Sequence, residues 1–527
     1  MKNLLPFLFF LALVACKKKE TTWNTDWVAP AVNDTLRLTS LFNDSTLVAG
    51  ASNSINVDLT RTILNIGLSD FLFIPDTTIR QNFNPSVSLN NVPPGYQFVN
   101  NIEEHNLNLE PIQLKKIRVS AGGINIKVYN PIETKAFFTI QLPGVTKNGV
   151  VFEKNYVVDG GTIANPGLAE EFLDISNYEI DLRGEQGIDY NFLQSRLTIK
   201  TDPNGPAVSI SSNNLFRFEA TFSNLKIDYA KGYFGNQIIE EISTFDVPYF
   251  NKITEGSINL PNTALQIIIE NGMKLSLKGK ITQASNTNVN GNTVNLNSNL
   301  LNNTFYVSPA TGIWNTLTPT YQQLNFDENN SNIKNYLENL GSSHQVGYQL
   351  QLNPWGNVSG GNDEIFPFSK IKLKVKAQLP LSLSANGLTL KDTFDLDLKQ
   401  DNSKTHIESG TITMKATNAF PLSCDAVLYL MDSNNVILHS VVAGAQISSA
   451  LLGTIDTADG LYKKNSTVDF VLTNAILKDI NKIKKVIVEA RFDTPNPSTG
   501  LSEIQFIPLG AFLAVKLNVK LNTKIIL

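Results

Sequence analysis

The stretch INIKVYNPIETKAFFTIQL, residues 124–142, contains the pattern on which the fold prediction rests. Apolar and polar residues alternate over its first five positions, which is the period of a β-strand with one buried and one solvated face. Asn130 and Pro131 interrupt this alternation, and a second alternating segment follows them. An asparagine can hydrogen-bond its own backbone and a proline cannot donate to a strand ladder, so the pair is expected to bend the chain between two strands.

The same unit recurs twice along the chain. Residues 411–430, TITMKATNAFPLSCDAVLYL, carry Asn418 with a proline three positions later, and residues 265–281, LQIIIENGMKLSLKGKI, carry Asn271 without a proline. In each copy one alternating strand precedes the asparagine and another follows it. We therefore expect the three asparagines to shape strand connections and not to bind a ligand.

Alternation continues along most of the remaining sequence, for example in residues 195–201, 370–384 and 512–525. Asn-Gly pairs, which favour the positive φ of tight hairpins, occur at 148–149, 204–205, 271–272, 290–291 and 386–387. Helical periodicity is confined to residues 331–341 and 473–483. The sequence therefore predicts a mainly β fold, built as tandem antiparallel β-sandwich-like modules or as an elongated curved sheet, with a few short helices.

The repeated unit resembles the late-embryogenesis-abundant type 2 (water-stress, WHy) module, a small β-sandwich whose repeat begins with a strand that ends in Asn-Pro. Asn130 and Pro131 keep this dipeptide, whereas the other two copies depart from it. The likeness extends over roughly half of the chain. It implies a fold only, because the family has no catalytic residues to carry over, and fold analogy alone does not assign a function.

The N-terminal sequence, MKNLLPFLFFLALVAC, contains an export signal. Lys2 precedes an apolar run that is shorter than the about 20 residues of a membrane-spanning helix, which is typical of a secretory signal peptide over residues 1–15. Residues 13–16, LVAC, resemble the lipobox of bacterial lipoproteins. This resemblance implies that Cys16 is lipidated and becomes the mature N-terminus, and several acyl chains make such an anchor effectively permanent.

Three lysines, Lys17, Lys18 and Lys19, follow the proposed lipidation site. In lipoproteins of Bacteroidota-like bacteria, acidic residues at these positions are typical of surface-exported proteins, so the basic run leaves a periplasmic or a cell-surface facing open. The sequence predicts a protein held at the outer membrane by its lipid anchor. A net charge of −4 and a charged fraction of 17% indicate that nucleic acid is not a partner.

The chain is long enough for several domains, and its 42% hydrophobic residues suffice for their cores. We divide it into a signal peptide (1–15), a lipidated N-terminus with a tether (16–50), and β domains at 51–205, 206–325 and 326–527. Each β domain contains one copy of the asparagine unit.

Sequence motifs for catalysis or metal binding are sparse. The four histidines have no partner at metal-ligand spacing, and no phosphate-binding loop or dinucleotide fingerprint occurs. Asp395 and Asp397 share a strand face, which suits either Ca²⁺ or a solvated surface, and the surface is favoured. The sequence thus predicts no catalytic residue, no metal site and no cofactor.

The aromatic stretch FSNLKIDYAKGYFGNQ, residues 222–237, is the best candidate for a specific contact site. Tyr229, Tyr233 and Phe234 cluster beside two glycines. They either form a contact surface for a partner or close a strand corner against the core, and the second interpretation is favoured.

These observations predict a non-enzymatic, lipid-anchored cell-envelope protein that acts as a scaffold or accessory subunit of an outer-membrane assembly, with an outer-membrane protein as its partner. Two alternatives stay open. A lipid carrier of the envelope requires a continuous apolar groove, and a surface glycan-binding protein requires exposed aromatic rings beside carboxylates in one cleft. Two of the four tryptophans, Trp23 and Trp27, lie in the predicted tether, which weighs mildly against a sugar platform.

Overall fold

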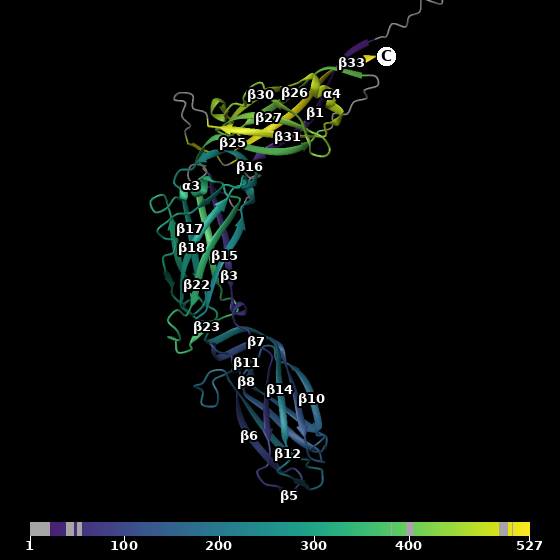
Figure 1. The fold of residues 1–527 in the computed structure, drawn as a ribbon, viewed down its shortest axis with the longest axis vertical. Helices are drawn as coiled ribbons and strands as arrows, with labels where there is room; N and C mark the ends of the chain where they lie inside the picture. Colours follow the sequence, from purple (N-terminus) through teal and green to yellow (C-terminus); the bar gives the residue numbers. More distant parts are fainter. Residues whose placement is uncertain are drawn as a thin grey trace, which may run out of the picture.

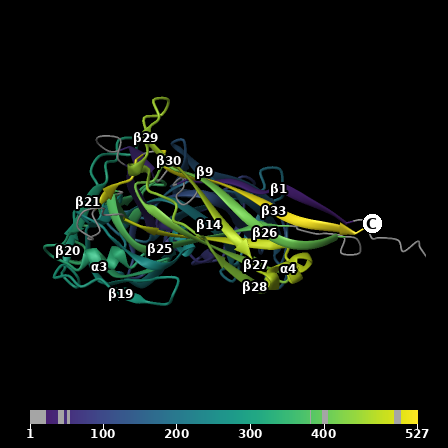
Figure 2. The same ribbon diagram turned by 90° about the horizontal axis from the view of Figure 1, so that it is seen from above.

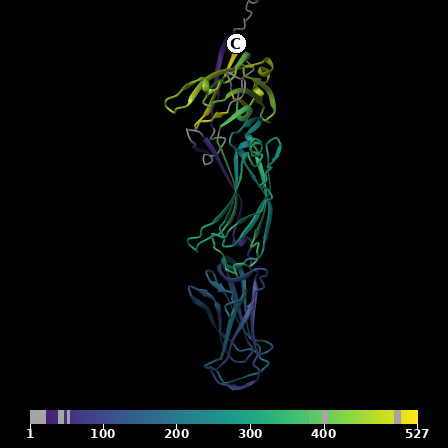
Figure 3. The same cartoon turned by 90° about the vertical axis from the view of Figure 1, so that its left-hand side faces the viewer.

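The computed structural model describes residues 22–37, 47–49, 55–380, 382–396, 405–494, 504–508 and 510–526. It is mainly β, with 61% of residues in strands and 5% in helices, and its sheets are antiparallel. This confirms the fold class predicted from the alternating pattern. The described strands form a lower, a middle and an upper module, stacked end to end along one long axis (Figure 1; the same stacking is seen from the side in Figure 3).

The lower module is a sandwich that lies farthest from the two ends of the described chain. One layer contains β4 (Thr77–Phe83), β14 (Phe216–Tyr233), β7 (Gln113–Asn130) and β10 (Gly167–Asp174), with β23 (Asp363–Ile365) added beside β14. The other contains β6 (Gln97–Asn106), β12 (Phe192–Thr201), β8 (Ala136–Lys147) and β9 (Val150–Val158). β11 (Glu179–Asp181) pairs with both β7 and β8 and so joins the layers, and β5 (Leu89–Val92) pairs with β13 (Val208–Ile210).

The middle module is a second sandwich. Its first layer has the order β2 (Leu47–Ala49), β3 (Ile55–Ile66), β24 (Ile371–Pro380), β17 (Ala264–Asn271), β21 (Thr320–Phe326). Its second layer has the order β15 (Ile238–Asp246), β22 (Ser343–Leu352), β18 (Leu277–Thr287), and β18 also pairs with β19 (Thr293–Asn295) and β20 (Phe305–Val307). Helix α3 (Ile333–Glu338) falls inside the predicted helical segment 331–341.

The upper module is a third sandwich and contains both ends of the described chain. One layer has the order β1 (Thr22–Arg37), β33 (Phe512–Ile526), β26 (Thr405–Asn418), β30 (Tyr462–Leu472), β29 (Thr454–Ile455). The other has the order β16 (Ile253–Asn259), β25 (Ser382–Asp395), β31 (Lys485–Asp493), β27 (Ser423–Met431), β28 (Ile437–Val442), with β32 (Gln505–Phe506) beside β25. Helix α4 (Asn474–Asp479) lies in the predicted segment 473–483. Over all three modules, the described residues also form the 3₁₀ turns η3 (Leu68–Asp70), η4 (Pro248–Lys252), η5 (Ala450–Leu452) and η6 (Ile480–Lys482).

The chain runs down this stack and back again. It begins in the upper module with β1, passes through β3 of the middle module, builds the lower module, and returns through β15 and β24 to finish at β33. The predicted division at residues 205 and 325 does not follow these sheets: residue 205 lies between two strands of the lower module, and residue 325 lies inside β21. The alternating pattern marks strands but does not say which distant strand each one joins, so the boundaries could not be placed from it.

Part of the predicted tether is a strand. β1 pairs with β33 along its whole length, from Thr22 opposite Ile526 to Arg37 opposite Phe512. Viewed from above, β1, β33 and β26 lie side by side; β33 points toward the C-terminus, and β1 and β26 run in the opposite direction (Figure 2). The first described residues therefore belong to the upper sandwich.

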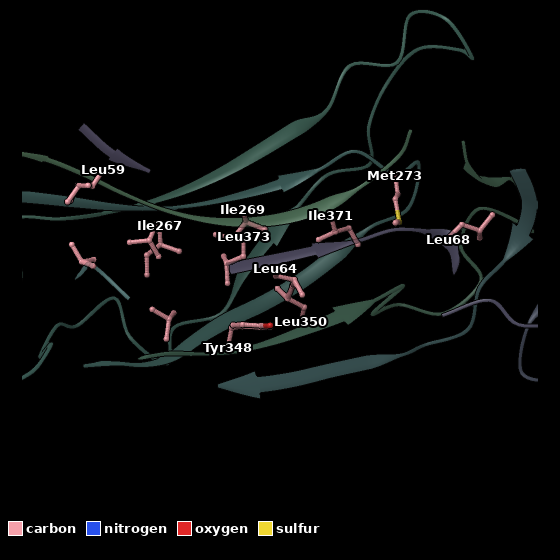
Figure 4. Packing of buried hydrophobic residues seen from close by; sticks show 14 of the residues in the cluster. Leu59, Leu64, Leu68, Ile267, Ile269, Met273, Tyr348, Leu350, Ile371 and Leu373 are labelled. Carbon is pink, nitrogen blue, oxygen red and sulfur yellow. The ribbon is translucent and has the colours of Figure 1, made fainter. Parts of the chain in front are cut away.

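The core follows the predicted alternation closely, as β24 illustrates. Its odd-numbered residues from Ile371 to Ala377 are buried, while Lys372 and Lys374 lie on the other face and pair with Glu270 at 3.1 and 2.6 Å. In the middle module, leucine and isoleucine side chains from β3, β17 and β24 meet Tyr348 and Leu350 of β22 between the two layers (Figure 4). Burial of one face of each layer against the other is the main stabilising contribution to such a sandwich.

The three predicted asparagines occupy equivalent positions in the three modules. Asn130, Asn271 and Asn418 are fully buried, and each ends a strand of one layer just before the chain enters the other layer. Each Oδ1 accepts a bond from the N–H two residues ahead, at 2.9 to 3.3 Å, and each Nδ2 donates to the carbonyl four residues ahead, at 2.8 Å in all three.

The connection after each asparagine, where the chain crosses from one layer to the other, is called the crossover. A further hydrogen bond from each Nδ2 links this crossover to a third segment of the same module. The acceptors are the carbonyls of Asp159 (3.0 Å), Ser308 (2.9 Å) and Ser448 (3.0 Å). None of the three asparagines has a positive φ, so they act through their amide groups and not through a left-handed backbone. Backbone N–H and C=O groups at the crossover have no partner strand to bond with, and the asparagine side chain provides their hydrogen-bond partner instead.

The Asn-Gly pairs divide into hairpins and other turns. Asn148 and Gly149, with φ of 53° and 79°, form the tight turn between β8 and β9, and Gly291, with φ of 83°, lies in the loop between β18 and β19. The pairs at 204–205 and 271–272 follow strands that do not pair with the next strand, and the pair at 386–387 lies inside β25. An Asn-Gly pair specifies a local bend, whereas the destination of the next strand depends on long-range packing.

Candidate functional site

The structure places the predicted aromatic contact site inside the molecule. Phe234 is fully buried, and its ring meets the edge of Phe71 at 5.9 Å between centroids. Tyr229 is 8% exposed, and Tyr233 is half-buried at the end of β14. The interpretation as a partner-contact surface is therefore wrong for Phe234 and Tyr229, because their rings pack where the lower module meets the middle one.

Tyr229 takes part in a cluster that joins the lower and middle modules. Its ring lies 5.2 Å from Trp314 and 5.6 Å from Phe366, both of which come from the middle part of the chain. Trp314 also covers the Arg118 guanidinium at 4.3 Å, and this guanidinium donates two bonds to Asp228 at 2.8 and 2.7 Å. The bidentate pair holds Arg118 flat beneath the indole ring, a favourable cation–π arrangement.

Polar contacts and strand pairing also join the lower and middle modules. β23 leaves the middle module and pairs with β14 of the lower one. The Glu364 carboxylate on β23 accepts bonds from the Tyr229 hydroxyl at 2.9 Å and from Lys274 at 2.5 Å, and Lys115 donates to the Gly360 carbonyl at 2.7 Å. Burial, together with Glu364, raises the pKa of the Tyr229 phenol, so that the hydroxyl remains a donor. The lower module is thus fixed to the middle one by several independent contacts.

One serine–histidine pair has distances that would suit nucleophilic catalysis. His105 Nε2 lies 2.7 Å from Ser195 Oγ, a pairing between β6 and β12 that no local motif indicated. Ser195 Oγ lies 3.0 Å from Gln81 Oε1, which can only accept, so the serine donates to Gln81 and the histidine must donate to the serine. Burial lowers the pKa of His105, and Ser195 and Gln81 are fully buried. A general base must accept the serine proton, so this network holds strands together and does not activate a nucleophile.

The other predicted site residues lie as follows. Within the described part of the chain, no group of three or more His, Cys, Asp or Glu residues is arranged to hold a metal ion. Asp395 is exposed, and Asp397 lies outside the described residues, as does Cys16.

Cys424 is buried and forms no disulfide, and burial raises the pKa of its thiol. None of the helices in the described ranges is long and apolar enough to cross a membrane.

Small cavities lie between the layers of two modules. The middle module encloses about 40 Å³ near Leu59, Phe245, Tyr336 and His344. His344 is held there by the Tyr336 hydroxyl at 3.1 Å and the Gly341 carbonyl at 2.9 Å, so both of its ring nitrogens are engaged. The upper module has a cleft of about 150 Å³. Its walls come from β1 and β33 on one side and from β25 and β31 on the other.

Comparisons with known proteins identify no family. No family model matches this chain, and no curated protein sequence matches it. Among solved structures, the chain is similar to a protein of Parabacteroides distasonis described as secreted, with 12% identity, a TM-score of 0.27, and coverage of 54% of this chain and 82% of that one. It is also similar to a peptide-N(4)-(N-acetyl-β-D-glucosaminyl)asparagine amidase, with 12% identity, a TM-score of 0.15, and coverage of 57% and 96%.

Proposed function

We propose that the protein is a non-enzymatic, lipid-anchored component of the cell envelope that acts as an elongated scaffold or accessory subunit of an outer-membrane assembly. The observation that carries this proposal is the pairing of β1 with β33, which brings both ends of the described chain to the upper module. Thr22 lies six positions after Cys16, so a lipid on Cys16 would hold the upper sandwich within about 21 Å of the membrane surface. The other two modules then extend away from it.

The contacts around Tyr229 that join the lower and middle modules support this role, because a scaffold must hold its modules in a fixed relative orientation. A flexible connection would allow the lower module to take many orientations, whereas strand pairing between β14 and β23 and the Arg118–Asp228 pair fix it to the middle module. An outer-membrane protein that contacts the lower or middle module would be held at a defined distance from the membrane. The asparagine crossovers, repeated in all three modules, support a relation of these modules to the type 2 late-embryogenesis-abundant repeat.

The cavities favour a scaffold over a lipid carrier. Pockets for small molecules usually enclose about 300–1,000 Å³. The cavity near Leu59 in the middle module and the cleft beside β1 in the upper module measure about 40 and 150 Å³, and each is too small for a bound acyl chain. A carrier would need the layers of a sandwich to separate.

Purification of the native protein in mild detergent through a C-terminal tag tests the proposal. We expect mass spectrometry to find an acylated Cys16 at the N-terminus and an outer-membrane protein in near-equal amount. Cys16→Ala is the control, and this variant should lose the acyl mass and leave the membrane fraction. An unmodified Cys16 would refute the anchor, and an acylated chain that brings down a defined lipid but no protein would favour the carrier.

A further inference from the structure

An aromatic pair is exposed on the surface of the middle module. Trp355 and Tyr306 stack with their ring centroids 5.4 Å apart and an angle of 18° between the ring planes. They are 56% and 53% exposed, so the core does not account for their position. The two aromatic rings come from different parts of the middle module, β20 and the loop after β22, and each leaves much of its surface open to solvent.

The loop that carries Trp355 is held in place by its backbone and by a buried amide. Asn353 and Gly356 flank the tryptophan with φ of 46° and 76°, and the Gly356 N–H donates to the Asn353 carbonyl at 2.9 Å. The Asn353 side chain is buried and donates to Asp363 at 3.0 Å. The indole is therefore presented on a turn that is already ordered, which lowers the entropic cost of binding.

Strand register places polar side chains beside this pair. Tyr306 lies opposite Lys278, and Lys278 lies opposite Gln351, so the three side chains share the outer face of the sheet. Two residues along the strands, Lys280 lies opposite Gln349 on the same face. The stacked rings of Tyr306 and Trp355, here called the aromatic platform, therefore lie beside the ammonium groups of the two lysines and the amides of the two glutamines.

The charges of this face indicate the kind of ligand. Lys278 and Lys280 form no salt bridge with any carboxylate in the described part of the chain. Glu240, a carboxylate on the neighbouring strand, already accepts a bond from Gln349 at 2.7 Å. The ammonium groups are thus available to an anionic ligand. Because Gln351 Nε2 also donates already, to Asn236 at 2.7 Å, the two glutamines can serve the ligand's hydroxyl groups mainly through their amide oxygens.

We propose that this face, formed by Tyr306, Trp355, Lys278, Lys280, Gln349 and Gln351, binds an acidic polysaccharide. A sugar ring presents an apolar C–H face that can pack on the exposed indole and phenol rings. Its hydroxyl groups require donors and acceptors at the margin of the platform, and its carboxylates require cations. The sheet face supplies all three. This site does not depend on the scaffold role, because it would operate whether or not a protein partner is bound.

Affinity electrophoresis of the full mature chain in native gels tests the site with a matched pair of probes. The gels contain polygalacturonate, its methyl ester, a second acidic polysaccharide such as alginate, or a neutral xylan. We expect the acidic polysaccharides to retard the protein and the methyl ester and xylan to retard it less. Trp355→Ala and Tyr306→Ala should each weaken the retardation about tenfold or more. The double variant K278Q/K280Q should lose the preference for polygalacturonate over its ester.

Tyr321→Ala is the control, because Tyr321 is a 55% exposed tyrosine on β21, in the opposite layer of the same module. It should bind as the wild type does, and thermal unfolding should confirm that all variants are folded. The proposal is overturned if no polysaccharide retards the wild type, or if Trp355→Ala, still folded, is retarded equally. Stronger binding of single-stranded nucleic acid through the same residues would also overturn it.

Discussion

Replacement of Asn418 by alanine is expected to destabilise the upper module by about 3–5 kcal/mol, because three buried backbone groups lose their partner at once, at about 1–3 kcal/mol for each unsatisfied group. The wild-type side chain accepts a bond from the Phe420 N–H and donates to the carbonyls of Leu422 and Ser448. Alanine offers no polar atom, and Asn418 is fully buried, so water cannot take over these bonds.

Hydrogen exchange followed by mass spectrometry is the appropriate measurement, since a chain of several modules need not unfold in one step. Peptides from β26 and β27 should lose protection in Asn418→Ala, while peptides of the lower module keep theirs. Asn465→Ala is the matched control. Asn465 is exposed and bonds only the neighbouring Thr417 at 2.7 Å, so its loss should cost no more than about 0.5 kcal/mol. Equal effects of the two variants would contradict the role assigned to the crossover asparagine.

Phe234→Ala should cost about 3–5 kcal/mol, the usual range for removing a buried aromatic ring. Phe234 is fully buried and packs against Phe71, which lies just after η3 at the start of the lower module. The resulting cavity would loosen the place where the chain enters and leaves this module. We expect the midpoint of chemical unfolding to fall accordingly.

Tyr233→Ala provides the comparison, because Tyr233 is the adjacent residue, also aromatic and only half-buried. Its removal should cost less than about 1.5 kcal/mol, in line with the smaller apolar area that it buries. If Tyr233→Ala destabilises more than Phe234→Ala, the burial described for this stretch is incorrect and the surface interpretation of the aromatic cluster returns.

Much of the local structure was predictable from sequence. The alternation in residues 370–384 appears as β24 and the start of β25, and the helical segments appear as α3 and α4. The asparagines of the repeated unit were expected to shape strand connections, and they do so in all three modules. These features depend on residues that are close together in the sequence, so the pattern of apolar and polar residues is enough to predict them.

The arrangement of the modules was not predictable in the same way. The partner of β1 is nearly 500 residues away in β33, and the hydrogen bond between Asn522 and Asp26 spans 496 positions. Strand pairing at such separation depends on how the whole chain packs, since many alternating strands fit equally well opposite β1. The stacked pair of Tyr306 and Trp355 was not predicted either. The two residues are distant in the sequence, and neither lies in a recognisable motif.

In the proposed arrangement, the molecule stands on the membrane with its upper module near the lipid and its lower module far from it. Energy transfer in vesicles that carry the acylated protein measures this directly, from a fluorophore on Val28→Cys of β1 or on Val87→Cys beside β5 to an acceptor lipid. Both positions are exposed, at 61% and 65%, whereas Cys424 is buried and should not react.

We predict strong transfer from position 28 and almost none from position 87, because the 18 residues of β14 alone extend over about 60 Å between the joint and the tip of the lower module. Equal transfer from the two positions, or stronger transfer from position 87, would contradict the proposed orientation.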